Sequence, residues 1–298
     1  MNNPLQMKLP LNERHGTAAF QGALGANSHQ ACRMTVPQMS VLPCPDFEQT
    51  IQAVVDGAAD VAVIPIENSS AGRVADMHRL LPDSGLHIIA EHYQPIQHAL
   101  VAKPGADKAT LREVFSHEQA LSQCRTYLRD HGLEARKFSD TAAAAAWIAD
   151  AGQAHQAAIC PALAAEIYDL QIIEAPINDH AQNTTRFVIL AKQPETPSMD
   201  QPAVTSLLFR TRSEPASLYK ALTSFATLGI NITKLESYLI GDRFDVAQFY
   251  IDVIAHQDSE AFKIALRDLR YFCVEDDVRV MGCYAAHGFR RGLRLPTL

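Results

Sequence analysis

Short apolar runs alternate with stretches of helical spacing from the start of the chain to about residue 191. The run 61–66 (VAVIPI) is continuous, as in a strand buried on both faces, and the run 187–190 has the same character. Between such runs, apolar residues recur every three or four positions, as at Ile51, Val54 and Val55, which indicates helices with one buried face. Strands that alternate with helices predict an α/β domain with a parallel sheet.

The pattern changes after residues 194–203, which contain three prolines and which we interpret as a linker. Beyond it, Gly229 ends a predicted helix, and Gly241-Asp242 joins two predicted strands as a hairpin. The resulting order, βαββαβ, is typical of a small α+β module with an antiparallel sheet. The predicted elements are strands at 205–212, 230–240, 244–254 and 278–284 and helices at 214–229 and 259–269.

Polar residues follow the apolar runs where the predicted strands of the first part end. Active sites of α/β sheets lie at the carboxyl ends of the strands, so we expect these clusters to converge on one site. A helix that begins there adds free backbone N–H groups and the positive end of its dipole, which favour an anionic ligand. The candidate residues are Asn27, Ser28, Glu67, Asn68, Ser69, Ser116, Gln123, Thr141, Thr184, Thr185, Arg186 and Phe187.

The run 183–187, in which four polar residues precede Phe187, supplies the residues on which this interpretation depends most. Arg186 can hold a carboxylate through a two-pronged hydrogen-bonded fork, and Thr185 can donate a hydrogen bond to a leaving oxygen. A carboxylate such as Glu67, directly after a buried strand, is costly unless it is paired or takes part in chemistry. The alternatives are a surface turn with an exposed arginine and, for Ser69, a helix cap only.

Composition and charge narrow the class of protein. At 298 residues the chain has room for two domains with their own cores, and a formal net charge of -7 argues against nucleic acid as the main partner. The six cysteines include no Cys-x-x-Cys pair, the twelve histidines form no His-Glu-x-x-His motif, and no Walker or Rossmann motif is present. We therefore expect catalysis by side chains alone, with no metal and no cofactor.

The two ends of the chain suggest no function of their own. Residues 1–14 lack the apolar core of a secretory signal, and no apolar run is long enough to span a membrane. We therefore expect a loose leader over residues 1–16 and a cytoplasmic protein. The other end, 287–298, contains Arg290, Arg291 and Arg294, and we interpret it as a solvated basic tail.

Five motifs, in this order and spacing, resemble those of prephenate dehydratase. They are residues 22–29 (GALGANSH), 65–69 (PIENS), 116–124 (SHEQALSQC), 140–142 (DTA) and 184–187 (TTRF). A further stretch, residues 229–237 (GINITKLES), is similar to the ACT domain that follows the catalytic domain in that family. The resemblance extends over roughly residues 17–286.

The resemblance implies a fold and a set of boundaries. The catalytic domain, residues 17–193, would have two lobes like a type II periplasmic binding protein, with the substrate between them. The first lobe would comprise residues 17–95 and 181–193, and the second residues 96–180. Residues 204–286 would form the ACT domain, a ferredoxin-like α+β module.

The resemblance also implies a reaction, the decarboxylating dehydration of prephenate to phenylpyruvate in phenylalanine biosynthesis. This reaction makes the ring aromatic, which supplies the driving force and requires no metal or electron sink. Carried over by position, the catalytic residues would be Thr185, Glu67, Asn68, Ser116 and Gln123. The substrate-binding residues would be Asn27, Ser28, Ser69, Thr141, Thr184, Arg186 and Phe187.

The ACT domain implies inhibition by phenylalanine, bound between two such domains of a homodimer or homotetramer. The effector-binding residues would be Leu218, Gly229, Ile230, Asn231, Glu236 and Ser237. Many members of the family have Thr-Tyr in place of Ala26-Asn27, which leaves Asn27 a supporting role. Many also have Arg-Pro in place of Tyr238-Leu239, a difference that bears on the phenylalanine response.

Three alternatives remain open on the sequence. Arogenate dehydratase catalyses the same reaction on a substrate with an amine in place of the keto group. A non-catalytic amino-acid sensor would combine a binding-protein fold with an ACT domain and would bind its ligand without turnover. The ACT domain could also serve only to hold subunits together.

Overall fold

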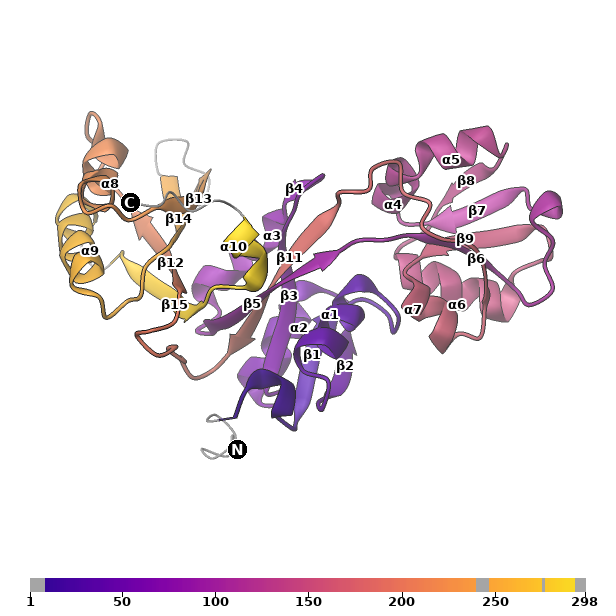
Figure 1. Ribbon diagram of the computed structural model, residues 1–298, viewed down its shortest axis with the longest axis horizontal. Helices are drawn as coiled ribbons and strands as arrows, with labels where there is room; N and C mark the ends of the chain where they lie inside the picture. Colours follow the sequence, from indigo (N-terminus) through magenta and orange to yellow (C-terminus); the bar gives the residue numbers. More distant parts are fainter. Residues whose placement is uncertain (1–8, 240–246, 275–276, 293–298) are drawn as a thin grey trace. The chain divides into compact units, whose positions relative to one another are not determined.

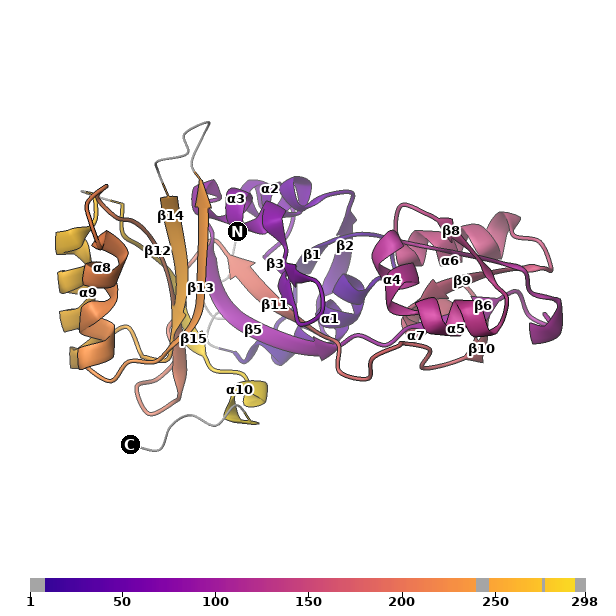
Figure 2. The same cartoon turned by 90° about the horizontal axis from the view of Figure 1, so that it is seen from above.

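Three β-sheets organise the part of the chain that this computed structural model describes, residues 9–239, 247–274 and 277–292 (Figures 1 and 2). The α/β class predicted for the first part and the α+β class predicted for the second are both confirmed. Short 3-10 helices lie at Leu11–Glu13, Leu81–Asp83 and Lys108–Thr110. The predicted hairpin turn at Gly241-Asp242 lies outside the described residues.

The first sheet has the strand order β2-β1-β3-β11-β5, with β4 paired to β3. Its strands are β1 (Thr17–Gln21), β2 (Ser40–Cys44), β3 (Val61–Asn68), β4 (Gly72–Arg73), β5 (His87–Pro95) and β11 (Thr184–Ala191). The helices in this part of the chain are α1 (Asn27–Thr35), α2 (Phe47–Asp56) and α3 (Ala75–Leu80). The first four residues of β3 are buried, as its continuous apolar sequence predicts, and β3 runs parallel to β1. Asp46 caps α2 by accepting a hydrogen bond from the Gln49 backbone N–H at 2.7 Å.

The second sheet has the order β10-β6-β9-β7-β8. Its strands are β6 (Ala99–Ala102), β7 (Glu113–Ser116), β8 (Glu134–Lys137), β9 (Gln156–Cys160) and β10 (Gln171–Glu174). Its helices are α4 (Glu118–Gln123), α5 (Arg125–Asp130), α6 (Thr141–Ala151) and α7 (Ala162–Ile167). The expected parallel pairing holds for β7 with β8 and β9, but β6 is antiparallel to both β9 and β10. The sheet is therefore mixed rather than all parallel.

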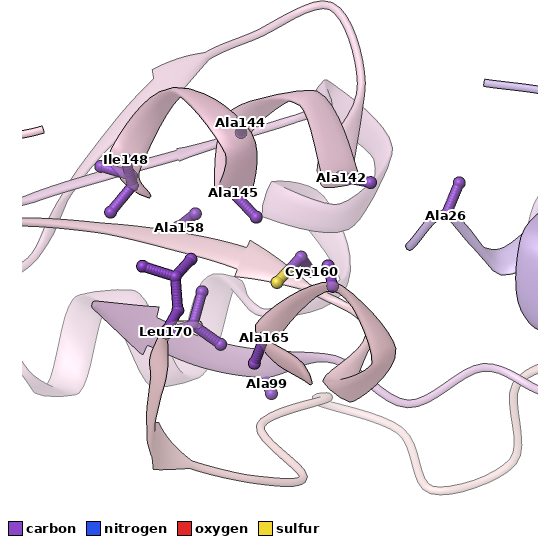
Figure 3. Packing of buried hydrophobic residues seen from close by; sticks show 12 residues of the cluster. Ala26, Ala99, Ala142, Ala144, Ala145, Ile148, Ala158, Cys160, Ala165 and Leu170 are labelled. Carbon is purple, nitrogen blue, oxygen red and sulfur yellow. The ribbon is translucent and has the colours of Figure 1, made fainter. Parts of the chain in front are cut away.

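Alanines form much of the core of this second sheet (Figure 3). Ala142, Ala145 and Ile148 of α6 are fully buried, and Ala145 points toward Cys160 of β9. Alanine favours the helix and also lets it lie close to the strand beneath it. The alanine-rich sequence therefore accounts for both the helix and its packing.

The third sheet has the order β13-β14-β12-β15 and is antiparallel throughout. Its strands are β12 (Ala203–Arg210), β13 (Ile232–Leu239), β14 (Ala247–Val253) and β15 (Arg279–Ala285), and its helices are α8 (Ser217–Thr227) and α9 (Glu260–Phe272). Both helices lie along one face of the sheet (Figure 2). Their inner residues Phe225, Phe262 and Leu269 are fully buried in the core of this module. The order βαββαβ agrees with the sequence prediction.

The chain forms two units, each assembled from two stretches of sequence. The first contains Met1–Val74 and Tyr93–Phe187, and the second contains Ala75–His92 and Val188–Leu298. The segment Ala75–His92 thus belongs with the C-terminal module. Within the second unit, a Cβ atom added to Gly282 would lie 2.0 Å from the carbonyl oxygen of Ile88, so only glycine fits at that contact.

Arg290, in helix α10 (Gly288–Gly292), is buried within the second unit, so the prediction of a solvated tail is wrong for this residue. Its guanidinium forms a fork with Glu91, with Nε 2.6 Å from Oε1 and Nη2 2.9 Å from Oε2. The Glu91 side chain is 0% exposed and that of Arg290 is 6% exposed. Arg290 also donates to Thr233, and its Nη2 lies 3.8 Å from Oδ2 of the buried Asp252. A buried carboxylate needs such a partner, and no local pattern in the sequence indicates that Arg290 is the partner of Glu91.

Candidate active site

The candidate site forms where the carboxyl end of β3 meets the amino end of β11, within the first unit. The Ser69 backbone N–H donates to the Thr184 carbonyl at 2.9 Å, and the Thr184 N–H donates to Ser69 Oγ at 2.9 Å. The Asn68 side chain donates to Thr185 Oγ1 at 2.9 Å in the same place. Apart from Asn183, the residues of the 183–187 run therefore lie at the start of β11, and these contacts bring them to the carboxyl end of β3.

Arg186 and Glu67 form an ion pair, with Nη1 2.9 Å from Oε1. The Arg186 side chain is 1% exposed, which excludes the alternative of a surface turn with an exposed arginine. Its guanidinium carbon also lies 6.0 Å from the centroid of the Tyr93 ring, within the range of a cation–π contact. Glu67 is half-buried, and its partner explains how a carboxylate can follow a buried strand.

Asn68 has a fixed orientation because two backbone N–H groups bind its side-chain oxygen. Ser70 and Ala71 both donate to Oδ1 at 2.9 Å. A backbone N–H group can only donate, so the opposite end of the amide must be the Nδ2 group. That group donates to Thr185 Oγ1 at 2.9 Å and to Asn183 Oδ1 at 2.7 Å.

Thr185 is 8% exposed, and its hydroxyl oxygen accepts the hydrogen bond from Asn68. A hydroxyl group has one proton to donate besides the lone pairs with which it accepts. Within the described residues, that proton has no acceptor in the protein. The geometry therefore leaves Thr185 as a hydrogen-bond donor toward a ligand.

Gln123, at the end of α4, connects the second sheet to this cluster. Its Oε1 accepts from Asn183 Nδ2 at 3.0 Å and lies 2.9 Å from Nε2 of His98. Asn183 and His98 are both 3% exposed. Sequence reasoning did not include either as a site residue. Asn183 stood in the polar run 183–187 and could have been chosen, whereas His98 is a single histidine with no motif around it.

Several predicted site residues make contacts of another kind. Ser116 is fully buried, and its hydroxyl donates to the Ile159 carbonyl at 2.6 Å. Ser69 and Thr184 hold the two strand ends together, and Phe187 is a core residue that is 1% exposed. Within the described part of the chain, no side-chain hydrogen bond links Asn27, Ser28 or Thr141 to the Asn68 cluster.

The helix N-termini near these residues differ in how they are capped. Asp140 caps α6 by accepting from two backbone N–H groups, and His117 Nδ1 accepts from the Gln119 N–H at the start of α4. Helix α1 has Ala26 as its N-cap and no side-chain cap. Its first N–H groups are therefore not taken by a capping side chain, and they offer a place for an anion next to Asn27.

Gly25 brings this end of α1 against the second sheet's helix α7. Its φ of +91° is a conformation that favours glycine, and an added Cβ would lie 2.7 Å from the Cα of Ala164. Next to it, the Tyr168 hydroxyl donates to the Leu24 carbonyl at 2.9 Å. The glycine pair in the first motif thus serves a close approach of backbone to backbone, at least at Gly25.

The predicted effector residues lie in the C-terminal module. Leu218 is in α8, Gly229 has a φ of +69° just after that helix, and Ile230 is buried in the module core. Asn231 is exposed and precedes β13. Further along β13 lie Glu236, whose Oε1 is 3.3 Å from Lys234 Nζ, and Ser237.

Neither a metal site nor a membrane span is found in the described residues. Nowhere among them do three or more histidine, cysteine, aspartate or glutamate side chains gather so as to hold a metal ion. The same residues form no helix with the length and apolar character needed to cross a membrane. The six cysteines are buried and reduced, and burial raises the pKa of Cys124, which follows Gln123, to about 12.

Comparisons with known proteins agree with this geometry. A family model described as prephenate dehydratase matches residues 18–195. The chain is 42% identical to a bifunctional N-acyl-homoserine lactone acylase/prephenate dehydratase from Komagataeibacter europaeus, over 92% of this chain and 97% of that protein. It is 37% identical to arogenate dehydratase 3 of Arabidopsis thaliana, over 95% of this chain and 72% of that protein. A crystal structure of prephenate dehydratase with L-Phe from Arthrobacter aurescens superposes with a TM-score of 0.83 at 27% identity, covering 91% of this chain and 90% of that one.

Proposed function

Because the chain belongs to the prephenate dehydratase family, which implies a dehydratase, we propose that it converts prephenate to phenylpyruvate. In this reaction the ring carboxylate leaves as carbon dioxide, the ring hydroxyl leaves to form water, and the ring becomes aromatic. The observation that carries the proposal is the orientation of Thr185. Its oxygen accepts from Asn68, so its proton is available to the departing oxygen.

The reaction requires the protein to stabilise the negative charge on the departing oxygen, and it requires no covalent intermediate with the protein. The carbon–carbon bond to the ring carboxylate breaks and its electron pair enters the ring, while the carbon–oxygen bond breaks with its pair on oxygen. The departing oxygen gains negative charge in the transition state, so a hydrogen bond from Thr185 stabilises that state more than the substrate. This difference is what accelerates the reaction.

The two carboxylates of prephenate need positive partners, and two candidates lie in the first unit. Arg186 carries a fixed positive charge, and its Nη1 pairs with Glu67. The start of α1 has N–H groups that no side chain caps. We propose that these two features hold the substrate, with Asn27 and Ser28 beside the second.

Prephenate is proposed over arogenate on the strength of the bacterial relative. That relative is named for prephenate dehydratase and matches this chain over 97% of its own length. The plant relative is named for arogenate and is matched over 72% of its length. Arogenate carries an ammonium group where prephenate has a keto oxygen, so the two substrates differ by a positive charge.

Turnover of both substrates by the purified full-length chain tests the proposal. Phenylpyruvate from prephenate and phenylalanine from arogenate are quantified by chromatography, and kcat/KM is compared. We expect prephenate to be preferred at least roughly tenfold, a difference of about 1.4 kcal/mol in transition-state binding. The reverse ranking identifies an arogenate dehydratase. Binding of either compound with no product from either one identifies the non-catalytic sensor.

We also propose that phenylalanine binds the C-terminal module, as an ACT domain, in a homodimer or homotetramer and inhibits turnover. The Arthrobacter relative with bound L-Phe supports this, as does the βαββαβ order of this module. In this proposal Asn231, which is exposed between α8 and β13, meets the amino acid's polar groups, and Leu218, in the first turn of α8, offers apolar contact. Calorimetry and activity are measured together. If millimolar phenylalanine gives no heat and no change in rate, the module only joins subunits.

We do not extend the acylase activity of the Komagataeibacter relative to this chain. Such hydrolysis needs a nucleophile activated by a base. Among the described residues, Ser116 donates to a backbone carbonyl and Thr185 accepts from Asn68, so neither hydroxyl has a histidine or carboxylate partner. Burial also raises the pKa of Cys124 to about 12, which disfavours the thiolate form that acts as a nucleophile. Release of fatty acid from an acyl-homoserine lactone by the purified chain would overturn this conclusion.

A further inference from the structure

We infer that His98 is a positioning residue of the dehydratase site, because its Nε2–H group donates to Gln123 and thereby turns the Gln123 amide N–H groups toward the substrate. The inference rests on the proposed function for its substrate. Its geometric basis is a chain of four hydrogen-bonded side chains, Asn68, Asn183, Gln123 and His98, in which the direction of each hydrogen bond follows from the one before it. All of them lie in the first unit.

The hydrogen-bond directions in this chain are set by the backbone N–H groups of Ser70 and Ala71. They donate to Asn68 Oδ1, so Asn68 Nδ2 donates to Asn183 Oδ1 at 2.7 Å. The other end of the Asn183 amide must then be Nδ2, which lies 3.0 Å from Gln123 and donates to its Oε1. Gln123 Oε1 is therefore an acceptor. Exchanging the oxygen and nitrogen of this amide would place its NH₂ group against the Asn183 NH₂ group, so its orientation follows from that of Asn183.

His98 closes the chain at Gln123. Its Nε2 lies 2.9 Å from the same Oε1, which can only accept, so Nε2 must carry a proton. In the neutral ring this assigns the other nitrogen, Nδ1, as the unprotonated one. Burial lowers the pKa of His98, with the hydrogen bond to Gln123 acting in the opposite sense, and the neutral form is consistent with that direction.

The Nδ1 atom of His98 is buried and has no hydrogen-bond partner among the described residues. A residue kept only for packing would avoid this cost, because a phenylalanine fills the same space without an unpaired nitrogen. The backbone of His98 is also held on both sides, since its N–H donates to Asn178 Oδ1 at 2.7 Å and its carbonyl accepts from the Ile177 N–H at 3.0 Å. The backbone at this position is therefore fixed, and within the described residues the one hydrogen bond of the ring is that with Gln123.

The consequence for the site lies at the far end of the Gln123 amide. Its oxygen is occupied by two donors, so its Nε2 group is the end left for a ligand, and no protein acceptor contacts it in the described residues. An amide with only one of these donors is held less firmly and can turn its oxygen toward an anionic substrate. His98 therefore acts on the reaction through Gln123, without contact to the reacting atoms.

Two variants separate positioning from packing. His98→Phe keeps a ring and loses the donor, whereas His98→Gln keeps an amide donor at similar reach. We expect His98→Phe to lower kcat/KM about tenfold, the size of one lost hydrogen bond, and His98→Gln to remain within about threefold of the wild type. In a Gln123→Ala background His98→Phe should lower kcat/KM by less than about twofold, since the residue it positions is gone.

A packing role predicts different results. With a packing role, His98→Phe would lower kcat/KM by the same factor in the wild-type and Gln123→Ala backgrounds. Alternatively, His98→Gln would have the same low kcat/KM as His98→Phe although it melts at the temperature of the wild type. Either result overturns the inference. Failure of the proposed function is recognised separately, because the wild type would then turn over neither prephenate nor arogenate. The predicted tautomer of His98 can be tested without an activity assay. In ¹⁵N-labelled wild-type protein, the His98 ring should be protonated at Nε2, and protonation at Nδ1 alone refutes the assignment.

Discussion

Replacing Thr185 with alanine removes a single hydroxyl group from a side chain that is 8% exposed. If that hydroxyl donates to charge that develops on the leaving oxygen, its loss should lower kcat by about 10²–10³, or about 2.7–4 kcal/mol. The cost to stability should be smaller, about 1 kcal/mol, because the Asn68 amide that loses Thr185 as acceptor keeps Asn183 at 2.7 Å. A large loss of rate with a small loss of stability is the expected result.

Thr184→Ala is the matched control. Thr184 binds Ser69 through its backbone N–H and carbonyl, so its side chain is not needed for that contact. We expect its kcat to stay within about threefold of the wild type. Initial rates at saturating prephenate and urea unfolding are measured for both variants. Equal, small losses of rate for Thr185→Ala and Thr184→Ala would refute the reasoning.

Asn68→Asp tests the direction of the hydrogen bond at nearly constant shape. The new carboxylate still accepts from the Ser70 and Ala71 N–H groups, but it can no longer donate to Thr185. The Thr185 hydroxyl then donates its hydrogen bond to the new carboxylate, so it no longer donates to the substrate. The kcat should fall about as far as in Thr185→Ala, and combining the two substitutions should add little because both remove the same donated bond. Fully additive losses would show that Thr185 does not donate to the substrate.

The remaining predictions concern charge. Arg186→Lys should raise KM at least tenfold, because a point charge cannot both pair with Glu67 and present a fork to a carboxylate; an unchanged KM in steady-state assays argues against this role. Arg290→Met should lower the free energy of unfolding, measured in urea, by about 3–5 kcal/mol, because it leaves the Glu91 carboxylate buried without its partner. The control Arg267→Met, at a side chain that is 76% exposed, should lower it by less than about 0.5 kcal/mol. Turnover should be unchanged by exhaustive chelation; activity lost to a chelator and restored by a divalent ion contradicts a site of side chains alone.

The parts of the site that the sequence could predict depend on local pattern. The buried run 61–66 is followed by Glu67 and Asn68. Both residues lie in the cluster because the cluster forms at the carboxyl end of that strand, where sites of α/β sheets are expected. The strands β5 and β6 were not predicted. In β5, His87–Pro95, polar residues such as Glu91 and His92 interrupt any continuous or alternating apolar pattern. β6, Ala99–Ala102, is an apolar run of only four residues, and periodicity alone does not assign such a run to a strand.

The parts that could not be predicted depend on partners distant in sequence. Asn68 and Thr185 are 117 positions apart, and only the pairing of β3 with β11 brings them together. Ser116 carries a side chain suited to catalysis, but its hydroxyl is used by the carbonyl of Ile159 on the neighbouring strand. Arg290 looked like part of a solvated tail until Glu91, 199 positions away, supplied the buried charge that it pairs with. Sequence shows which groups are available, and tertiary structure decides which of them are already engaged.

The assembly of the second unit from Ala75–His92 and Val188–Leu298 limits how such a protein can be cut or fused. A gene fragment that stops at the proline-rich stretch 194–203 looks like a complete enzyme in the linear sequence, yet it would carry Glu91 without Arg290 and Ile88 without Gly282. The C-terminal module taken alone would lack the same contacts from the other side. Recombination that exchanges this module between relatives would therefore have to carry the 75–92 segment with it, as a pair of inserts rather than as one cassette.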